Sequence, residues 1–381
     1  MAKIAFINQR VLGHLIPSCG IAAALQENGH EVTFFNHKSF KCMLNEMDFK
    51  FSEVGWGMYP NRFIEEFTNE LLCLFRKDPP DLILSDSSLP APAFAAERLN
   101  IPWVSIQTTL PVPDHLLPGG PHVQKKLQRN YQNYLNETRD KLGLNVLPLD
   151  RVRGDLAGLS DRLHLITVLP ELVHSGETFP ASSEFIGPCL PSGTESRTFE
   201  KDPSRPLILV CTSSIKDPHP KQLCREYAQA AIEAFGKKEV QVVICSNEAS
   251  PEKLPPNIHW VNTYPNHDFY MPVADIVITH GGCGTLQKGL LLGKPMLIVP
   301  LGGDHNVLAQ RCKDLGVAEV LPPDFISPVN IGELTKQLLK PTFTDRCAAL
   351  AAPLQKRFSN KLAASLIENK IFYKKGSHEE W

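Results

Sequence analysis

The sequence predicts an α/β protein made of two Rossmann-like domains, each with a doubly wound parallel sheet, that face each other across a cleft. Short runs of β-branched and aliphatic residues recur, and each is followed by a stretch with helical character. Runs such as LILV and VVIC lack polar alternation, which is typical of parallel strands covered on both faces. The length of 381 residues corresponds to two domains or slightly more at roughly 150 residues each.

The elements follow from these runs in order. Strands are expected in the first half at Lys3–Asn8, Glu31–Asn36, Asp81–Ser85, Trp103–Gln107 and Leu163–Val168. In the second half they are expected at Leu207–Cys211, Val240–Cys245, Ile258–Val261, Asp275–Thr279, Met296–Val299 and Val317–Leu321. Helices are expected between them, among others at Ser18–Asn28, Asn61–Arg76, Pro220–Phe235 and Asn306–Leu315. This alternation favours right-handed β-α-β units.

A break in composition separates the two halves. The stretch 179–206 is rich in Pro, Ser, Gly and charged residues, and a buried strand is expected directly after it. We therefore expect an N-terminal domain at 1–195, a linker at 196–206 and a C-terminal domain at 207–358. A C-terminal helix and tail are expected at 359–381.

Charge and composition exclude several protein classes. The 39 Lys and Arg residues against 41 Asp and Glu give a net charge of −2, which argues against a nucleic-acid partner held by a basic surface. No apolar run approaches the roughly 18 residues that cross a bilayer, and the N-terminus lacks a signal-peptide pattern. The ten cysteines form no Cys-x-x-Cys pair, so free and mostly buried thiols are expected rather than disulfides or zinc. The expectation is a cytoplasmic protein.

A glycine-rich turn is the strongest motif. The expected strand Asp275–Thr279 runs into HGGCGT, and a helix is expected after it. Glycines let the backbone approach a ligand closely, and the N–H groups of a following helix bind anions, so this turn suits a diphosphate. An ordinary strand-to-helix turn is the alternative. The chain contains neither G-x-G-x-x-G after its first strand nor G-x-x-x-x-G-K-[ST], which argues against NAD and P-loop chemistry.

The segment THGGCGTLQKGLLLGKPMLIVPLGGDHNVLAQRCKDLGVA resembles the nucleotide-sugar signature of family-1 glycosyltransferases with the GT-B fold. The N-terminal GHLIP and the order of the two domains agree with this family, so the resemblance covers most of the chain. It implies a nucleotide-sugar-dependent transferase of natural products or other small molecules, with the acceptor on the first domain and the donor on the second. A UDP- or dTDP-sugar would be the co-substrate of this hexosyltransferase, without a further cofactor.

Carried over by position, the resemblance implies a donor site. The positions expected at the diphosphate are His280, Gly281, Gly282, Gly284 and Thr285. The donor sugar is expected at Asp304 and His305. The nucleobase is expected near Tyr264 and Asn266, with Thr108 and Ser213 also close to the donor.

Lys288 departs from the family pattern. Relatives commonly carry Glu three residues after the Thr or Ser, where its oxygens accept from ribose hydroxyls. Lysine only donates, so another group replaces this clamp or the donor nucleotide differs. A solvated helix residue is the alternative.

An acid–base pair is expected in the first domain. His14 follows the first strand, at the edge where α/β sheets carry ligands, and an imidazole suits a base near pH 7. Asp86 ends the strand LILSD, and a carboxylate there would orient the ring. The alternatives are a structural loop histidine and a helix N-cap aspartate. The family places its base and supporting aspartate at these positions, which implies transfer with inversion. No Asp-x-Asp motif is present, which fits chemistry without a metal.

The acceptor is the least defined part of the site. Trp56, Phe63 and His115 are expected to line its pocket, and aromatic residues there would suit a hydrophobic or aromatic molecule. A homodimer is compatible with the sequence. Two other functions stay open: a nucleotide-sugar epimerase of the same fold, and a catalytically idle nucleotide-sugar-binding protein.

Overall fold

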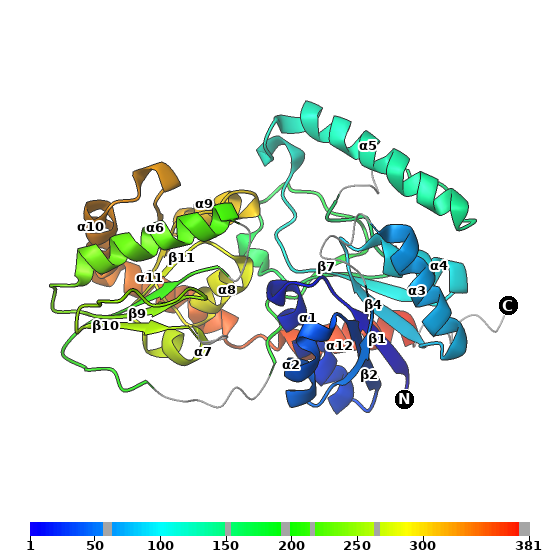
Figure 1. The fold of residues 1–381 in the computed structure, drawn as a ribbon, viewed down its shortest axis with the longest axis horizontal. Coiled ribbons are helices and arrows are strands. Elements are labelled where there is room, and N and C mark those ends of the chain that lie inside the picture. The colour runs from blue at the N-terminus through cyan, green and yellow to red at the C-terminus, as the bar shows by residue number, and fades with distance from the viewer. Residues whose placement is uncertain (56–62, 149–153, 192–198, 214–217, 263–266, 373–381) are drawn as a thin grey trace. The chain divides into compact units, whose positions relative to one another are not determined.

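The chain folds into two compact units, each built around its own parallel sheet (Figure 1). The computed structural model describes residues 1–55, 63–148, 154–191, 199–213, 218–262 and 267–372. Unit 1 comprises Met1–Ser192 together with Phe358–Trp381, and unit 2 comprises Gly193–Arg357. The C-terminal segment therefore returns to the unit in which the chain begins.

Unit 1 contains a seven-stranded sheet in the order β3-β2-β1-β4-β5-β6-β7. Its strands are β1 Lys3–Ile7, β2 Glu31–Asn36, β3 Lys50–Glu53, β4 Leu82–Asp86, β5 Trp103–Gln107, β6 His164–Ile166 and β7 Ser183–Phe185. Every pair is parallel. The order reverses at β1, so the carboxyl ends of β1 and β4 form the switch point where such sheets bind ligands.

Helices cover both faces of this sheet. They are α1 Leu12–Glu27, α2 Lys41–Glu46, α3 Ile64–Lys77, α4 Pro90–Leu99, α5 Gly120–Lys141 and α12 Ser359–Ile367. Successive side chains of β1 point to opposite faces of the sheet, so they belong to two different parts of the hydrophobic core. Ile4 and Phe6 pack with α1 and α12, whereas Ala5 and Ile7 pack with α3 and α4.

Unit 2 contains a six-stranded parallel sheet in the order β10-β9-β8-β11-β12-β13. Its strands are β8 Leu207–Cys211, β9 Gln241–Cys245, β10 Ile258–Val261, β11 Ile276–Thr279, β12 Met296–Ile298 and β13 Ala318–Val320. Its helices are α6 Pro218–Phe235, α7 His267–Tyr270, α8 Cys283–Leu291, α9 Asp304–Asp314, α10 Pro328–Leu338 and α11 Pro341–Leu354. β8 and β11 are buried along their whole length, as their unbroken aliphatic runs predict.

The predicted α/β fold class is confirmed, with three differences in detail. β3 and β7 are edge strands that the sequence did not predict, and β7 lies inside the stretch that reads as linker from 179 onward. The first helix starts at Leu12 rather than Ser18, and Pro17 lies inside it. Proline lacks the N–H that would bond to the carbonyl of Gly13, yet the helix continues to Glu27.

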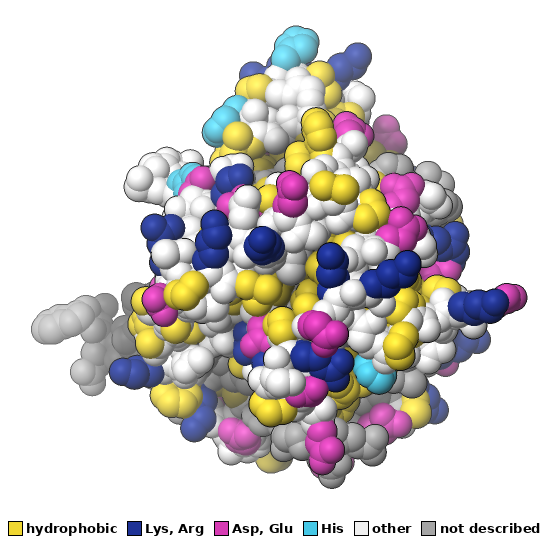
Figure 2. Space-filling view, turned by 90° about the vertical axis from the view of Figure 1, so that its left-hand side faces the viewer, with side chains coloured by type: hydrophobic (Ala, Val, Ile, Leu, Met, Phe, Trp, Pro, Cys, Tyr) yellow, Lys and Arg dark blue, Asp and Glu magenta, His cyan; other side chains and the backbone are white. Residues whose placement is uncertain are grey.

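The mixed charge of the surface and the free thiols agree with what the amino-acid composition predicts. Figure 2 shows one face of the molecule, on which basic and acidic side chains are interspersed with apolar ones. All ten cysteines are free thiols; eight are buried, whereas Cys42 and Cys73 are exposed. The helices in the described ranges are too short or too polar to cross a membrane.

Candidate active site

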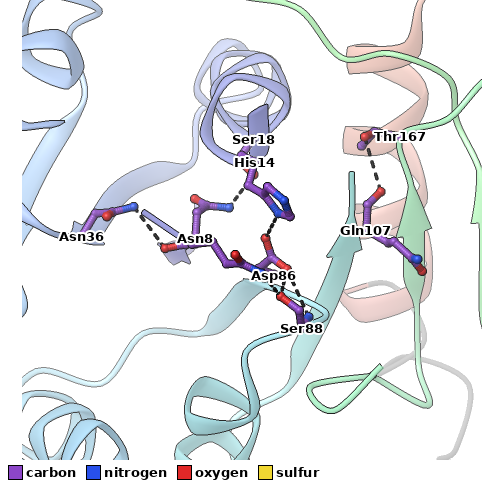
Figure 3. A network of polar contacts seen from close by, with 9 residues as sticks. Asn8, His14, Ser18, Asn36, Asp86, Ser88, Gln107 and Thr167 are labelled. Carbon is purple, nitrogen blue, oxygen red and sulfur yellow. Dashed lines mark hydrogen bonds and ion pairs between the residues drawn. The ribbon is translucent and has the colours of Figure 1, made fainter. Parts of the chain in front are cut away.

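Unit 1 brings His14 and Asp86 together at the switch point of its sheet (Figure 3). β1 and β4 are paired in parallel, His14 lies in the first turn of α1, and Asp86 is the last residue of β4. His14 Nδ1 lies 2.5 Å from Asp86 Oδ2. The aspartate side chain is 2% exposed and the imidazole 19%. In this arrangement the carboxylate accepts from Nδ1–H, which makes Nε2 the basic nitrogen of the ring.

Asp86 is held on its other oxygen as well. The backbone N–H and the hydroxyl of Ser88 both donate to Asp86 Oδ1, at 3.1 Å and 2.6 Å. Burial raises the pKa of Asp86, but the His14 charge and hydrogen bond and the Ser88 hydrogen bonds outweigh it, so the pKa lies below its ordinary value. The alternative role as a helix N-cap is wrong, because Leu89 occupies that position before α4.

Buried amides fix the start of α1 beside this pair. Asn8 Nδ2 donates to Ser18 Oγ at 2.7 Å, and Ser18 Oγ donates to the carbonyl of His14 at 3.4 Å. Asn36 Nδ2 donates in turn to the carbonyl of Asn8 at 3.4 Å (Figure 3). The backbone that carries His14 is therefore tied to both β1 and β2.

Unit 2 carries the glycine-rich turn between β11 and α8. Gly282 is the N-cap residue of α8, and Gly281 has a φ of +90°, which glycine adopts far more readily than other residues. A Cβ on Gly282 would lie 2.6 Å from His280 Nε2, so a side chain at this position would displace the imidazole. Exposed N–H groups and the positive end of the helix dipole make this turn suited to an anionic ligand.

His280 is a buried, neutral histidine at this turn. Burial, followed by the charges of His305 and His267, lowers the pKa of His280 to about 3. The rings of His280 and His305 meet edge to face, with centroids 5.4 Å apart. Nδ1 of each ring is buried without a hydrogen-bond partner in the described structure. Buried nitrogens of this kind are usually satisfied, so both have hydrogen-bonding capacity to offer a ligand.

The residues predicted at the donor sugar begin α9, and Thr285 lies at the start of α8. Asp304 and His305 form the first turn of α9, after Gly303 with a φ of +60°. Their side chains approach each other, with His305 Nε2 3.9 Å from Asp304 Oδ1. Thr285 is half-buried in the first turn of α8.

Lys288 is paired rather than solvated. Its Nζ lies 2.5 Å from Oδ1 of Asp268 in α7, and the two side chains are 21% and 25% exposed. Half-buried His267 precedes Asp268 in sequence; desolvation and the Lys288 charge lower the pKa of His267 to about 4. The pair thus places a carboxylate from α7 beside the cation on α8.

A cavity of about 540 Å³ lies in unit 1 at the carboxyl ends of β5 and β6. A hydrogen-bonded chain forms its inner wall. His164 Nδ1 lies 2.9 Å from Ser105 Oγ, His164 Nε2 lies 3.0 Å from Gln107 Oε1, and Gln107 Nε2 donates to Asp155 at 3.2 Å. Burial lowers the pKa of His164 to about 4, so this histidine is neutral. The volume is in the range of small-molecule sites.

Of the remaining residues that the sequence predicts at the site, some lie at this cavity or at strand ends and others do not. His115 lines this cavity, whereas Phe63 precedes α3 with 46% of its surface exposed and does not line it. Thr108 follows β5, and its buried hydroxyl has no hydrogen-bond partner among the described residues; Ser213 follows β8, and its N–H donates to Cys224 Sγ. Trp56, Tyr264 and Asn266 lie outside the described residues. Within those residues, no group of three or more His, Cys, Asp or Glu is arranged to hold a metal.

Sequence reasoning missed Ser88, Asp268 and Gln107. Gln107 carried a usable signal, because it ends a buried strand next to the one that ends in Asp86. The contacts of Ser88 and Asp268 depend on side-chain geometry that no spacing rule reports.

Comparison with known proteins gives a consistent result. Residues 230–363 match the family model of the erythromycin biosynthesis protein CIII-like C-terminal domain. The NDP-glycosyltransferase YjiC of Bacillus subtilis (strain 168) is 22% identical over 357 residues, which cover 87% of each chain.

Solved structures match over nearly the whole length. The glycotransferase of kitacinnamycin is 21% identical with a TM-score of 0.84, covering 97% of this chain and 99% of its own. The glycosyltransferase VinC, solved in complex with dTDP, is 19% identical with a TM-score of 0.72, covering 96% and 98%. Together with the two parallel sheets, these matches show that the chain has the GT-B fold of these glycosyltransferases, and that it is similar to glycosyltransferases over most of its length.

Proposed function

We propose that this enzyme transfers a sugar from a dTDP- or UDP-sugar to a hydroxyl of a small molecule, with inversion and without a metal. The observation that carries the proposal is the His14–Asp86 pair, which joins a partly accessible imidazole to a buried carboxylate at the switch point of unit 1. An alcohol is a weak nucleophile at neutral pH, so the transfer needs such a base.

The proton moves from the acceptor to His14. With Nδ1–H bonded to Asp86, Nε2 holds the lone pair that accepts the hydroxyl proton as the oxygen attacks the anomeric carbon. The imidazolium that forms is stabilised by the adjacent carboxylate, which stays ionised because its pKa is held low. The bond from the anomeric carbon to the diphosphate oxygen breaks on the opposite side, so the configuration inverts.

The leaving diphosphate is stabilised by unit 2. The N-terminus of α8 offers backbone N–H groups and a positive dipole end, and neutral His280 and the Thr285 hydroxyl add hydrogen-bonding groups. The thymidine nucleotide in VinC and in the rhamnosyltransferase SpnG supports dTDP as the nucleotide to test first.

The acceptor is proposed to be a small molecule that enters the unit 1 cavity. Parallel strands lie roughly 5 Å apart. The cavity at β5 and β6 is therefore about one to two strands from the end of β4, where Asp86 lies. A hydroxyl of a molecule anchored there is within reach of His14. A cytoplasmic location stays a prediction from cysteine usage.

Two measurements test the proposal. Binding of dTDP or UDP is expected to raise the melting temperature, because a ligand that binds only the folded state stabilises it. Release of nucleotide from dTDP-glucose or UDP-glucose, with 4-nitrophenol as acceptor, is expected to fall at least about 100-fold in His14→Ala. His259→Ala, which removes an exposed imidazole on β10, is the matched control.

The outcomes separate the alternatives. Undiminished turnover by His14→Ala would show that another group is the base. Nucleotide binding without any turnover by the wild type would favour a catalytically idle binding protein. Interconversion of the donor sugar without an acceptor would favour an epimerase.

A further inference from the structure

The oxygen of Asp86 that faces away from His14 has its own set of donors. Ser88 donates to Oδ1 twice, through its N–H at 3.1 Å and its hydroxyl at 2.6 Å. Gln9 Nε2 donates in turn to the Ser88 hydroxyl oxygen. Because Gln9 supplies a proton to that oxygen, the hydroxyl hydrogen of Ser88 points to Asp86 in this arrangement. The chain of hydrogen bonds therefore has one direction, from Gln9 through Ser88 to the carboxylate.

These contacts close a ring around the base. Gln9 and His14 belong to the segment that follows β1, and Ser88 and Asp86 belong to the end of β4 and the turn after it. The two segments are joined twice, by His14 to Asp86 and by Gln9 to Ser88. The last torsion of aspartate is broad and two-fold, so a carboxylate bonded through one oxygen alone can turn. Here His14 holds Oδ2 and Ser88 holds Oδ1, and Gln9 fixes the Ser88 hydroxyl.

A plain turn does not need this arrangement. A turn closed by aspartate requires the Ser88 N–H alone. Two further hydrogen bonds are present beyond this requirement: the Ser88 hydroxyl donates to Asp86, and the Gln9 amide donates to the Ser88 hydroxyl oxygen. Both side chains are only half-buried, so packing does not account for them.

We propose that Ser88, held by Gln9, is a positioning residue that fixes the Asp86 carboxylate so that Oδ2 faces His14 Nδ1. The proposal rests on the proposed role of His14 as the base. Ser88 does not contact the substrate in this scheme; it acts only through Asp86. The effect of removing its hydroxyl should therefore vanish when Asp86 no longer carries a carboxylate.

The first test follows the His14 ring directly and needs no substrate. In ¹⁵N-histidine-labelled enzyme, the Nδ1–H proton of His14 is assigned by its loss in His14→Gln. Ser88→Ala is expected to shift this signal toward that of an ordinary imidazole, and Ser88→Thr to leave it near the wild-type position. Ser85→Ala is the matched control, because Ser85 is fully buried beside Asp86 but its hydroxyl has no hydrogen-bond partner in the described structure. An unchanged signal in Ser88→Ala overturns the proposal.

The second test is a double-mutant cycle on nucleotide release from dTDP-glucose or UDP-glucose with 4-nitrophenol. Ser88→Ala is expected to lower kcat about 10-fold with the donor KM unchanged within about twofold, and Gln9→Leu to lower it about threefold. In Asp86→Asn the same Ser88→Ala change is expected to alter kcat less than about twofold. An equal loss in both backgrounds would show that Ser88 acts independently of Asp86.

The failures of the two proposals are distinguishable. If His14→Ala stays active, the assignment of the base is wrong, whatever Ser88 does. If His14→Ala and Asp86→Asn are inactive but Ser88→Ala matches the wild type, only the positioning role is wrong. Should Ser88→Ala fold poorly, Ser88→Thr against Ser88→Val gives the same comparison, because the two side chains have nearly the same shape and differ by one hydroxyl.

Discussion

Replacing Gly158 by Ala should damage both stability and catalysis, although it is distant in sequence from His14 and Asp86. A Cβ there would lie 2.3 Å from the carbonyl oxygen of Leu89 and 3.2 Å from that of Asp86. Non-bonded carbon and oxygen atoms normally keep about 3.5 Å. The two backbones therefore have to separate by roughly 1 Å, and no side chain can move aside to relieve the contact.

The magnitude follows from these contacts. Forced overpacking costs about 1–3 kcal/mol. Separation also weakens the hydrogen bond from Gly158 N–H to the Ser87 carbonyl, 2.7 Å long, for about 1 kcal/mol more. A smaller gain of about 0.4–1 kcal/mol comes from stiffening the unfolded chain. The net loss in the unfolding free energy of unit 1 is about 1–4 kcal/mol. Displacing the turn that holds Asp86 by 1 Å is expected to lower kcat by about 100-fold.

Gly154→Ala is the control for this change. Gly154 is exposed, and a Cβ there meets no atom within 4 Å. Urea unfolding and nucleotide release from dTDP-glucose or UDP-glucose, measured on both variants, check the prediction. If Gly158→Ala matches Gly154→Ala in both assays, the turn does not constrain Asp86 as the geometry indicates.

Four further predictions concern charge. Asp86→Asn should lower kcat about 1000-fold, because the amide favours the wrong tautomer of the base; a loss below about tenfold in a steady-state assay would contradict this. The pKa of Asp86 lies below its ordinary value in the fold, so the stability that its carboxylate contributes is present above about pH 4 and lost as pH falls through the folded pKa. The gap in unfolding free energy between the wild type and Asp86→Asn should close in urea titrations on acidification below pH 4. Lys288→Met leaves Asp268, which is three-quarters buried, without its partner and should lower the free energy of unfolding in urea by about 1–3 kcal/mol. Adding Asp268→Asn to this variant should restore part of the loss. Equal stability of the wild type, the single variant and the double variant would contradict the pairing. Burial lowers the pKa of His164 to about 4 in the fold, whereas an unfolded histidine titrates near 6.5. As the pH falls from about 6.5 to 4, the unfolded chain therefore binds a proton that the folded chain does not, and the free energy of unfolding decreases by about 1.4 kcal/mol per pH unit. His164→Gln should remove that slope, and an unaltered slope would count against a neutral His164.

Much of the fold follows from the sequence because most strands are central and apolar. LILVC and QVVIC are buried at every position and are expected from their composition alone. The edge strands KFSE and SEF are short and half-exposed, so neither a hydrophobic run nor a strict alternation marks them. Their pairing is decided by neighbouring strands, which a local pattern does not contain.

The residues at the carboxyl ends of central strands could also be predicted from the sequence, whereas contacts between side chains could not. His14 and Asp86 were expected together because His14 follows one buried strand, Asp86 ends another, parallel strands end at one edge, and the resemblance places a base and its aspartate at these positions. The start of α1 was misplaced because Pro17 resembles a helix boundary, whereas in the fold it lies inside α1. Lys288 shows the limit most clearly. Its partner Asp268 is 20 residues away on another helix, and the pairing depends on how α7 packs against α8.

The return of the C-terminus to unit 1 has a consequence for biosynthesis. Ala363 and Ile367 of α12 are fully buried in the core that covers α1, and Asn360 bonds both backbone groups of Leu190. A ribosome delivers this helix only after all of unit 2. Until then the nascent chain carries an uncovered apolar face on α1, and transiently exposed apolar surface of this kind favours aggregation during folding. A truncation directly after unit 2 would leave that face uncovered, so α12 protects the first unit rather than the second.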